Sequence, residues 1–166
     1  MATITLKGNT IHTSGNLPKV GSKAPDFTLI DANLQEKSLK DFKGKKKILC
    51  TVPSLDTSVC ALSAKKFNEA AEKVEDLVVL YVSADLPFAQ KRVCGADNLT
   101  NIITLSMVRS KKFAEDYGVL ITDGPLAGIA ARSVIALDND DNVVYTELVP
   151  EIAQEPNYEM ALKAVC

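Results

Sequence analysis

The sequence predicts a three-layer α/β fold, with residues 1–166 forming a single domain. Short apolar runs typical of buried central strands alternate with segments of helical period, which favours a sheet covered by helices on both faces. A hairpin pattern and one more amphipathic segment close the chain. With 46% hydrophobic and 24% charged residues, the chain has the composition of an ordinary globular protein. No internal repeat, linker or low-complexity tract divides it.

The first half of the chain predicts a hairpin, two strands and a long helix. The segments TITLK and TIHTS flank Gly8-Asn9, which is typical of a two-residue hairpin turn. A strand is expected in PDFTLID after Pro25, and the apolar run 46–52 is expected to be a buried central strand. The lysines 45–47 at its start are expected to be solvated. A helix is expected over 59–75, where one apolar stripe contains Cys60, Ala64, Phe67, Ala71 and Val74.

The second half continues the alternation of strands and helices. The run LVVLYVS at 77–83 is the clearest buried strand, and Asp85 is expected to cap a short helix over 86–94 that Gly95 ends. The apolar segment NIITLSM precedes a helical pattern in SKKFAEDYGV. RSVIAL and NVVYTELV are expected to form a hairpin around DNDD, and EPNYEMALKAV a final amphipathic helix.

Charge and targeting signals exclude several functional classes. A net charge of −2 gives no electrostatic argument for binding nucleic acid or an anionic membrane. The N-terminus lacks the basic and apolar segments of a signal peptide, and no apolar run approaches the roughly 20 residues of a spanning helix. We therefore expect a cytoplasmic, reducing location, where cysteines are more often catalytic or redox-active than structural.

The residues that commonly bind metals or activate nucleophiles are sparse. His12, the single histidine, lies in the expected N-terminal hairpin and is interpreted as an exposed strand residue. The cysteines at 50, 60, 94 and 166 contain no close pair, which argues against a zinc site and against a thioredoxin-type dithiol. Asp138, Asp140 and Asn142 resemble the start of a calcium loop, but valines occupy its sixth and twelfth positions, so a polar turn is expected. No metal or organic cofactor is expected.

The stretch VPSLDTSVCALS places a cysteine at an expected helix start. Asp56, Thr57 and Ser58 are residue types that cap helices, and an apolar-periodic run follows them. The unpaired N–H groups of a helix N-terminus favour the charged, nucleophilic form of a thiol, and Thr57 is placed to offer it a hydroxyl. The same cysteine also lies on the apolar stripe of the helix. From the residues alone, Cys60 is either a reactive thiolate or a small buried hydrophobe.

Pro53, Thr57 and Cys60 match the P-x-x-x-T-x-x-C signature of the peroxiredoxins. The chain resembles the atypical two-cysteine subfamily, the bacterial thiol peroxidases, along nearly its whole length. SADLPFAQKRVCGAD, YGVLITDGPLAGIAARSV and EPNYEMAL are similar to characteristic segments of that subfamily. The resemblance implies a thioredoxin-like three-layer fold of the peroxiredoxin type with an added N-terminal β-hairpin.

The resemblance also implies a role for each matching residue. Cys60 would be the peroxidatic cysteine, which attacks a hydroperoxide and becomes a sulfenic acid. Thr57 would hydrogen-bond the thiolate and the peroxide, and Pro53 would shield the pocket from water. Arg132, in AARSV, would stabilise the thiolate and hold the peroxide oxygens. Cys94 would be the resolving cysteine, which forms an intrachain disulfide with Cys60.

The predicted elements add a structural requirement to that disulfide. A bridge needs Cα atoms within about 7 Å, yet Cys60 lies on a core-facing stripe and Cys94 ends a different helix. We therefore expect both segments to unwind on oxidation. Cys50 is expected to be buried and inert. Cys166, the last residue, is a competitor for the resolving role.

The sequence thus predicts a thiol-dependent peroxidase that reduces hydrogen peroxide and organic hydroperoxides. The resemblance suggests a preference for alkyl hydroperoxides, thioredoxin as reductant and a homodimer. Two alternatives stay open: a peroxide sensor that passes its oxidation to a partner protein, and a non-catalytic thioredoxin-like binding module.

Overall fold

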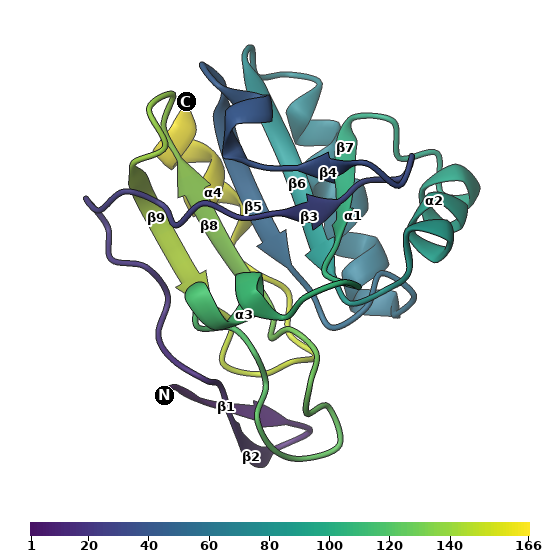
Figure 1. The fold of residues 1–166 in the computed structure, drawn as a ribbon, viewed down its shortest axis with the longest axis vertical. Coiled ribbons are helices and arrows are strands. Elements are labelled where there is room, and N and C mark those ends of the chain that lie inside the picture. The colour runs from purple at the N-terminus through teal and green to yellow at the C-terminus, as the bar shows by residue number, and fades with distance from the viewer.

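The computed structural model describes residues 1–166, which form a seven-stranded mixed sheet and a separate two-stranded hairpin (Figure 1). The sheet has the order β4-β3-β7-β6-β5-β8-β9. Its strands are β3 (Leu29–Ile30), β4 (Glu36–Lys37), β5 (Lys46–Thr51), β6 (Leu77–Ser83), β7 (Ile102–Ser106), β8 (Ser133–Leu137) and β9 (Val143–Leu148). The hairpin consists of β1 (Thr3–Leu6) and β2 (Asn9–His12).

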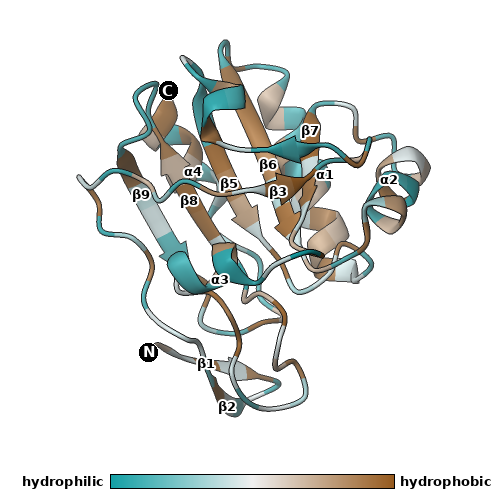
Figure 2. Cartoon of the chain, viewed as in Figure 1, coloured by the Kyte–Doolittle hydropathy of each residue, from teal (hydrophilic) through white to brown (hydrophobic).

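Helices cover both faces of this sheet. They are α1 (Ser58–Ala71), α2 (Pro87–Ala96), α3 (Lys112–Asp116), α4 (Tyr158–Val165) and the 3-10 turn η1 (Leu39–Phe42). Because side chains alternate along a strand, Ile48 and Cys50 of β5 enter the core under α1 and α4, whereas Leu49 enters the core under η1 and α3. Figure 2 shows that the central strands are made mostly of hydrophobic residues. The predicted three-layer α/β fold with an N-terminal hairpin is confirmed.

One edge of the sheet collects the segments that carry the candidate residues. Strands β5, β6 and β7 run parallel, so the loops that follow them leave from the same edge. Strand β8 runs antiparallel to β5, with Thr51 opposite Ser133, and Arg132 therefore enters the sheet at that edge as well. Pro53 and Arg132, distant in sequence, come from neighbouring strands.

Several element boundaries differ from the sequence predictions. The hairpin turn lies one residue earlier than expected, at Lys7 and Gly8, both with positive φ. Strand β3 has only two residues, so most of PDFTLID is irregular. Helix α1 ends at Ala71 rather than 75, and the chain then turns through Asp76 in the left-handed region to enter β6.

Asp85 does not cap α2, contrary to the prediction. The N-cap position is Leu86, which makes no side-chain capping bond, and Pro87 occupies the first turn. The helix also continues through Gly95 to Ala96. Its start is set by proline, whose fixed φ suits the first helical position. The carboxylate of Asp85 instead binds the loop that follows β5.

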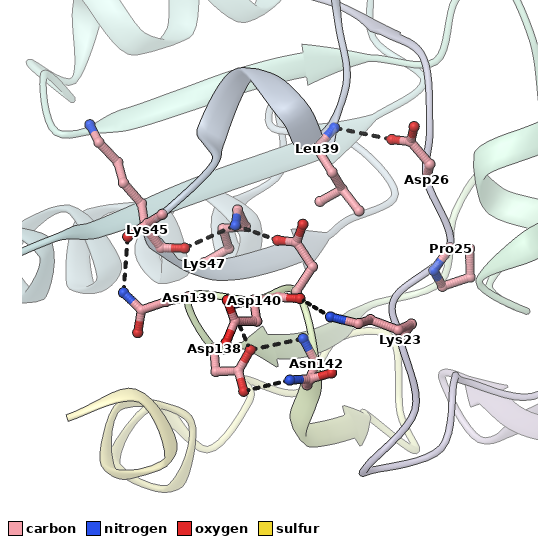
Figure 3. Close-up of polar contacts among 12 residues, drawn as sticks. Lys23, Pro25, Asp26, Leu39, Lys45, Lys47, Asp138, Asn139, Asp140 and Asn142 are labelled. Atoms are coloured by element: carbon pink, nitrogen blue, oxygen red, sulfur yellow. Dashed lines mark hydrogen bonds and ion pairs between the residues drawn. The ribbon is translucent and has the colours of Figure 1, made fainter.

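The expectation of solvated lysines is wrong for Lys47. Its side chain is completely buried at the start of β5, where it forms an ion pair with Asp141 and donates to the Lys45 carbonyl at 2.9 Å (Figure 3). The adjacent DNDD turn is closed by Asp138, whose carboxylate accepts from the backbone N–H groups of Asp140 and Asn142. This segment is a polar hairpin turn, as predicted. None of the helices combines the length and the hydrophobicity that a membrane-spanning segment requires.

Candidate active site

Cys60 lies in the first turn of α1 and is completely buried. Thr57 is the N-cap residue in an extended conformation, and its Oγ1 accepts from the Cys60 N–H at 3.4 Å. The thiol packs in the core that also contains Val52, Leu55, Phe67 and Tyr81. The two interpretations of the sequence are thus compatible, since the cysteine is buried and also lies at a helix N-terminus, whose field favours an anion.

Pro53 and Thr57 belong to the same loop as Cys60. Pro53 is buried directly after β5, whereas Thr57 is exposed. The Thr57 hydroxyl donates to the Ser54 carbonyl at 3.3 Å. It therefore braces the loop in this conformation and would have to rotate to donate to a sulfur or a peroxide oxygen.

Arg132 is a buried cation, with 3% of its surface exposed. Its Nε donates to the Ile152 carbonyl at 2.8 Å, and its Nη1 has no hydrogen-bond partner. No carboxylate forms an ion pair with it. A buried guanidinium with an unmet donor is suited to receive an anionic or oxygen-rich ligand.

The N-terminal hairpin supports the carbonyl that orients Arg132. Thr5 of β1 accepts from the Ile152 N–H at 2.9 Å and donates its own N–H to the Pro150 carbonyl at 2.8 Å. The Glu151 carboxylate accepts from the Thr5 hydroxyl at 2.5 Å and from the Lys7 N–H at 2.9 Å. These bonds lower the pKa of Glu151 to about 2. The hairpin thereby fixes residues 150–152 beside the arginine.

Cys94 is half-buried on α2, and the structure does not bring it onto Cys60. It opens onto a hollow that α2 forms with the β3–β4 region, where Lys37, Lys91 and Asn98 also lie. The side of α2 that faces the start of α1 carries Arg92, Val93, Ala96 and Asp97 instead. Burial, assisted by the charge of Asp97, raises the pKa of the Cys94 thiol. All four cysteines are free thiols.

The other predicted residues lie where the sequence placed them. Cys50 is buried on β5, as predicted, and that burial raises the pKa of its thiol far above the ordinary range. Cys166 is exposed at the chain end. His12 is half-exposed on β2, with its Nδ1 2.6 Å from Asp123 Oδ2. None of the three belongs to the turn that holds Cys60.

Sequence reasoning missed the partly buried carboxylate that holds the loop between β5 and α1. Asp85 accepts from the Ser54 hydroxyl at 2.7 Å, from the Leu55 N–H at 2.8 Å and from the Ser83 hydroxyl at 2.7 Å. The available signal was an aspartate directly after a buried strand, at the sheet edge where parallel strands present functional side chains. The prediction of a helix cap assigned this carboxylate to the wrong partner.

Comparison with known proteins gives a consistent result. The Redoxin family matches residues 19–162. Thiol peroxidases of Mycobacterium bovis and Mycobacterium tuberculosis are each 54% identical over 165 residues, which is 99% of this chain and of theirs. The crystal structure of a peroxiredoxin-like protein from Aquifex aeolicus has a TM-score of 0.92 and 44% identity, and covers 98% of this chain and 95% of that one.

A thiol peroxidase from Chromobacterium violaceum has the same TM-score, 0.92, at 24% identity, and covers 98% of this chain and 95% of that one. At that identity the similarity is one of fold. Together with the Aquifex structure, it confirms the predicted thioredoxin-like fold of the peroxiredoxin type.

Proposed function

The chain belongs to the Redoxin family and is a thiol-dependent peroxidase, and on this premise we propose that Cys60 is its peroxidatic cysteine. The observation that supports this proposal is that the turn of Cys60 and the side chain of Arg132 come from the same end of two neighbouring strands. The turn holding Pro53, Thr57 and Cys60 leaves β5 at the edge where the buried, unpaired Arg132 enters β8. A nucleophile at a helix N-terminus and a cation without an anion are the two groups that peroxide reduction requires.

The chemistry follows from these groups. The Cys60 thiolate attacks one oxygen of a hydroperoxide, so that an S–O bond forms and the O–O bond breaks. The departing oxygen takes a proton and leaves as an alcohol or water, while sulfur becomes a sulfenic acid. Arg132 stabilises the negative charge that develops on the departing oxygen, and Thr57 orients the peroxide after turning from the Ser54 carbonyl. Pro53 keeps water from the loop.

Cys94 is proposed as the resolving cysteine. Its sulfur attacks the sulfenic sulfur, an S–S bond forms, and the hydroxyl leaves as water. Cys94 lines the hollow beside β3 and β4, not the one between α2 and the start of α1, so we propose that this step requires α2 and the first turn of α1 to unwind. Hydrogen exchange that is faster at 57–61 and 86–96 in the oxidised protein than in the reduced one would support this. Equal protection in both states would contradict it.

The substrate is a hydroperoxide and the reductant a thiol, as the family implies. We propose alkyl hydroperoxides as the preferred substrates, thioredoxin as the reductant, a single domain over 1–166, and a cytoplasmic location where reduced thioredoxin is available. A homodimer is proposed as well. Its support is exposed apolar side chains on the segment that starts α2 and the segment that follows β7, which the Ser106–Asp85 hydrogen bond joins, namely Leu86, Phe88 and Val108. A Phe88→Asp variant that sediments as the wild-type dimer would contradict an interface there.

Turnover by cysteine variants tests the proposed function. We expect Cys60→Ser to abolish thioredoxin-coupled consumption of cumene hydroperoxide, whereas Cys50→Ser, the same change at another buried cysteine, keeps it. Wild-type protein that is oxidised once, does not turn over, and accumulates as a mixed disulfide with another protein would favour the peroxide sensor instead. The binding-module alternative is not supported, because the thiol peroxidase relatives indicate an enzyme.

A further inference from the structure

Asp85 joins the Cys60 loop to the segment that precedes α2. Its Oδ1 accepts from the Ser54 hydroxyl, and its Oδ2 accepts from the Leu55 N–H and the Ser83 hydroxyl, all at 2.7 to 2.8 Å. Hydrogen bonds to a carboxylate are about twice as strong as neutral ones. One side chain thus holds the loop after β5 against the end of β6.

The same bonds reach Thr57, the cap of α1. The Ser54 carbonyl accepts from the Thr57 hydroxyl, and the Ser54 Oγ accepts from the Asp56 N–H at 3.1 Å. Thr57 in turn accepts from the Cys60 N–H. A loop that is free of Asp85 would lose the fixed position of Ser54, and with it the cap that places the thiol at the helix start.

A second branch of the network reaches α2. Gln90, completely buried in that helix, donates from Nε2 to the Ser83 hydroxyl at 3.0 Å and to the Leu105 carbonyl at 3.1 Å. The Ser106 hydroxyl donates to the Asp85 carbonyl at 2.5 Å. Gln90 therefore attaches the first turns of α2 to Ser83, whose hydroxyl also binds the Asp85 carboxylate.

Gln90 is incompletely satisfied in this arrangement. Its Oε1 is buried and has no hydrogen-bond partner. A buried acceptor without a donor is unfavourable, and unwinding of α2 would expose it to water. Asp85 and the two bonds of Gln90 Nε2 therefore oppose the opening of this region, whereas the unmet Gln90 Oε1 favours it.

We propose that Asp85 is a positioning residue that holds Cys60 in its reactive conformation and delays the unwinding that brings Cys94 to it. The proposal rests on the proposed roles of Cys60 and Cys94. Asp85 touches neither thiol, and it acts through Ser54, Leu55 and Ser83. Asp85 therefore affects the two steps in opposite ways. It favours the oxidation of Cys60, which needs the folded loop, and it slows the attack of Cys94, which needs the unfolded loop.

Single-turnover kinetics of Asp85→Asn separates the two steps. Reduced protein is mixed with hydrogen peroxide, quenched at intervals, and assayed by mass spectrometry for sulfenic acid trapped at Cys60 and for the Cys60–Cys94 disulfide. We expect the sulfenic acid to form about tenfold more slowly, because a charge-assisted bond is lost, and the rate constant for its conversion to the disulfide to rise severalfold. Asp116→Asn is the matched control. That exposed carboxylate belongs to α3 and pairs with Lys112, at 2.7 Å, and we expect both rates to stay near those of the wild type.

Opposite changes in the two rates, together with faster hydrogen exchange confined to 54–61 and 83–96, distinguish positioning from a general loss of stability, which would speed exchange throughout the chain. Ser54→Ala removes one of the three bonds and should shift both rates in the same directions by less, so it carries the test if Asp85→Asn does not fold. Rates equal to wild type in both variants would overturn the role of Asp85 alone. Wild-type protein whose Cys60 is never oxidised would overturn the proposed function as well.

Discussion

The sheet buries one cation at each end of its central strands, and only one of the two has an ion-pair partner. Lys47, at the start of β5, is completely buried and forms an ion pair with Asp141 (Figure 3). Arg132 lies beside the other end of β5 and is nearly as buried. It has one carbonyl partner, no ion pair with a carboxylate and an Nη1 without any acceptor.

The difference indicates what each cation does. Removing a charge from water is costly unless a counter-charge compensates it. At Lys47 the protein supplies that counter-charge itself, so the pair stabilises the junction of β5 with the β8–β9 turn. At Arg132 no carboxylate forms an ion pair and Glu155 acts only at longer range, so the proposed thiolate and peroxide would provide the direct partner. A buried cation left without a partner is thus the stronger indication of a binding site.

The largest effect is expected for Arg132→Met. Loss of a donor aimed at a developing negative charge reduces rates by about 100- to 1,000-fold, so we expect such a fall in kcat/KM for cumene hydroperoxide. Stability should stay within about 1 kcal/mol of wild type or rise, because an uncompensated buried charge is removed. Steady-state peroxidase assays and urea unfolding measure the two. A variant that is destabilised but keeps wild-type activity would show that Arg132 has a structural role and not a catalytic one.

Lys47→Met should produce the opposite pattern. The change leaves Asp141 without its partner, and since that carboxylate is partly exposed we expect a loss of about 2 kcal/mol in the free energy of unfolding. Activity per folded molecule should stay within about twofold of wild type, the change being remote from the reacting atoms. The double variant Lys47→Met/Asp141→Asn should recover part of the stability, because it also removes the unpaired carboxylate. Asparagine tolerates the positive φ at position 141, so the second change adds no backbone strain. A fall in activity matching that of Arg132→Met would remove the distinction between the two cations.

A smaller, pH-dependent effect is expected at Glu151, which fixes the segment beside Arg132. The folded pKa of this carboxyl, about 2, lies below its ordinary value of 4.5, because the Thr5 hydroxyl and backbone N–H groups bind the charged form. Its contribution to stability is therefore complete above about pH 4.5 and is lost as the pH falls toward 2. We expect the difference in Tm between wild type and Glu151→Gln to be constant from pH 8 to 5 and to shrink below that. A difference that grows on acidification would contradict this sign.

Much of the fold could be predicted because its central strands are short apolar runs whose period is unambiguous. The bounds of β6 coincide with the predicted 77–83, and β5 ends within one residue of its prediction. Errors arose where tertiary contacts override local preference. Lys47 belongs to a basic run typical of a surface, and only the return of the chain at Asp141 gives it a buried partner. Asp85 likewise follows the rule for a helix cap, but its carboxylate binds a loop thirty residues earlier.

The site was predicted more completely than the partners of its residues. The P-x-x-x-T-x-x-C spacing located the turn of Pro53, Thr57 and Cys60, and the structure places that turn at a helix start. The roles of these residues, and of Arg132 and Cys94, stay predictions. That Arg132 has no ion-pair partner, and that Cys94 lines a hollow beside β3 and β4, depends on packing between distant segments. No local pattern encodes such contacts.

The central claim is that Cys60 reacts with peroxide and is resolved by Cys94, and its most direct test is a peroxide titration with disulfide mapping. Reduced protein would be titrated with hydrogen peroxide, digested under conditions that prevent exchange, and analysed by mass spectrometry. We predict that one equivalent is consumed and that the product is a Cys60–Cys94 bridge within one chain. A Cys60–Cys166 bridge between chains would keep the peroxidatic cysteine but contradict the resolving one. Peroxide consumption that leaves Cys60 a free thiol would contradict the account as a whole.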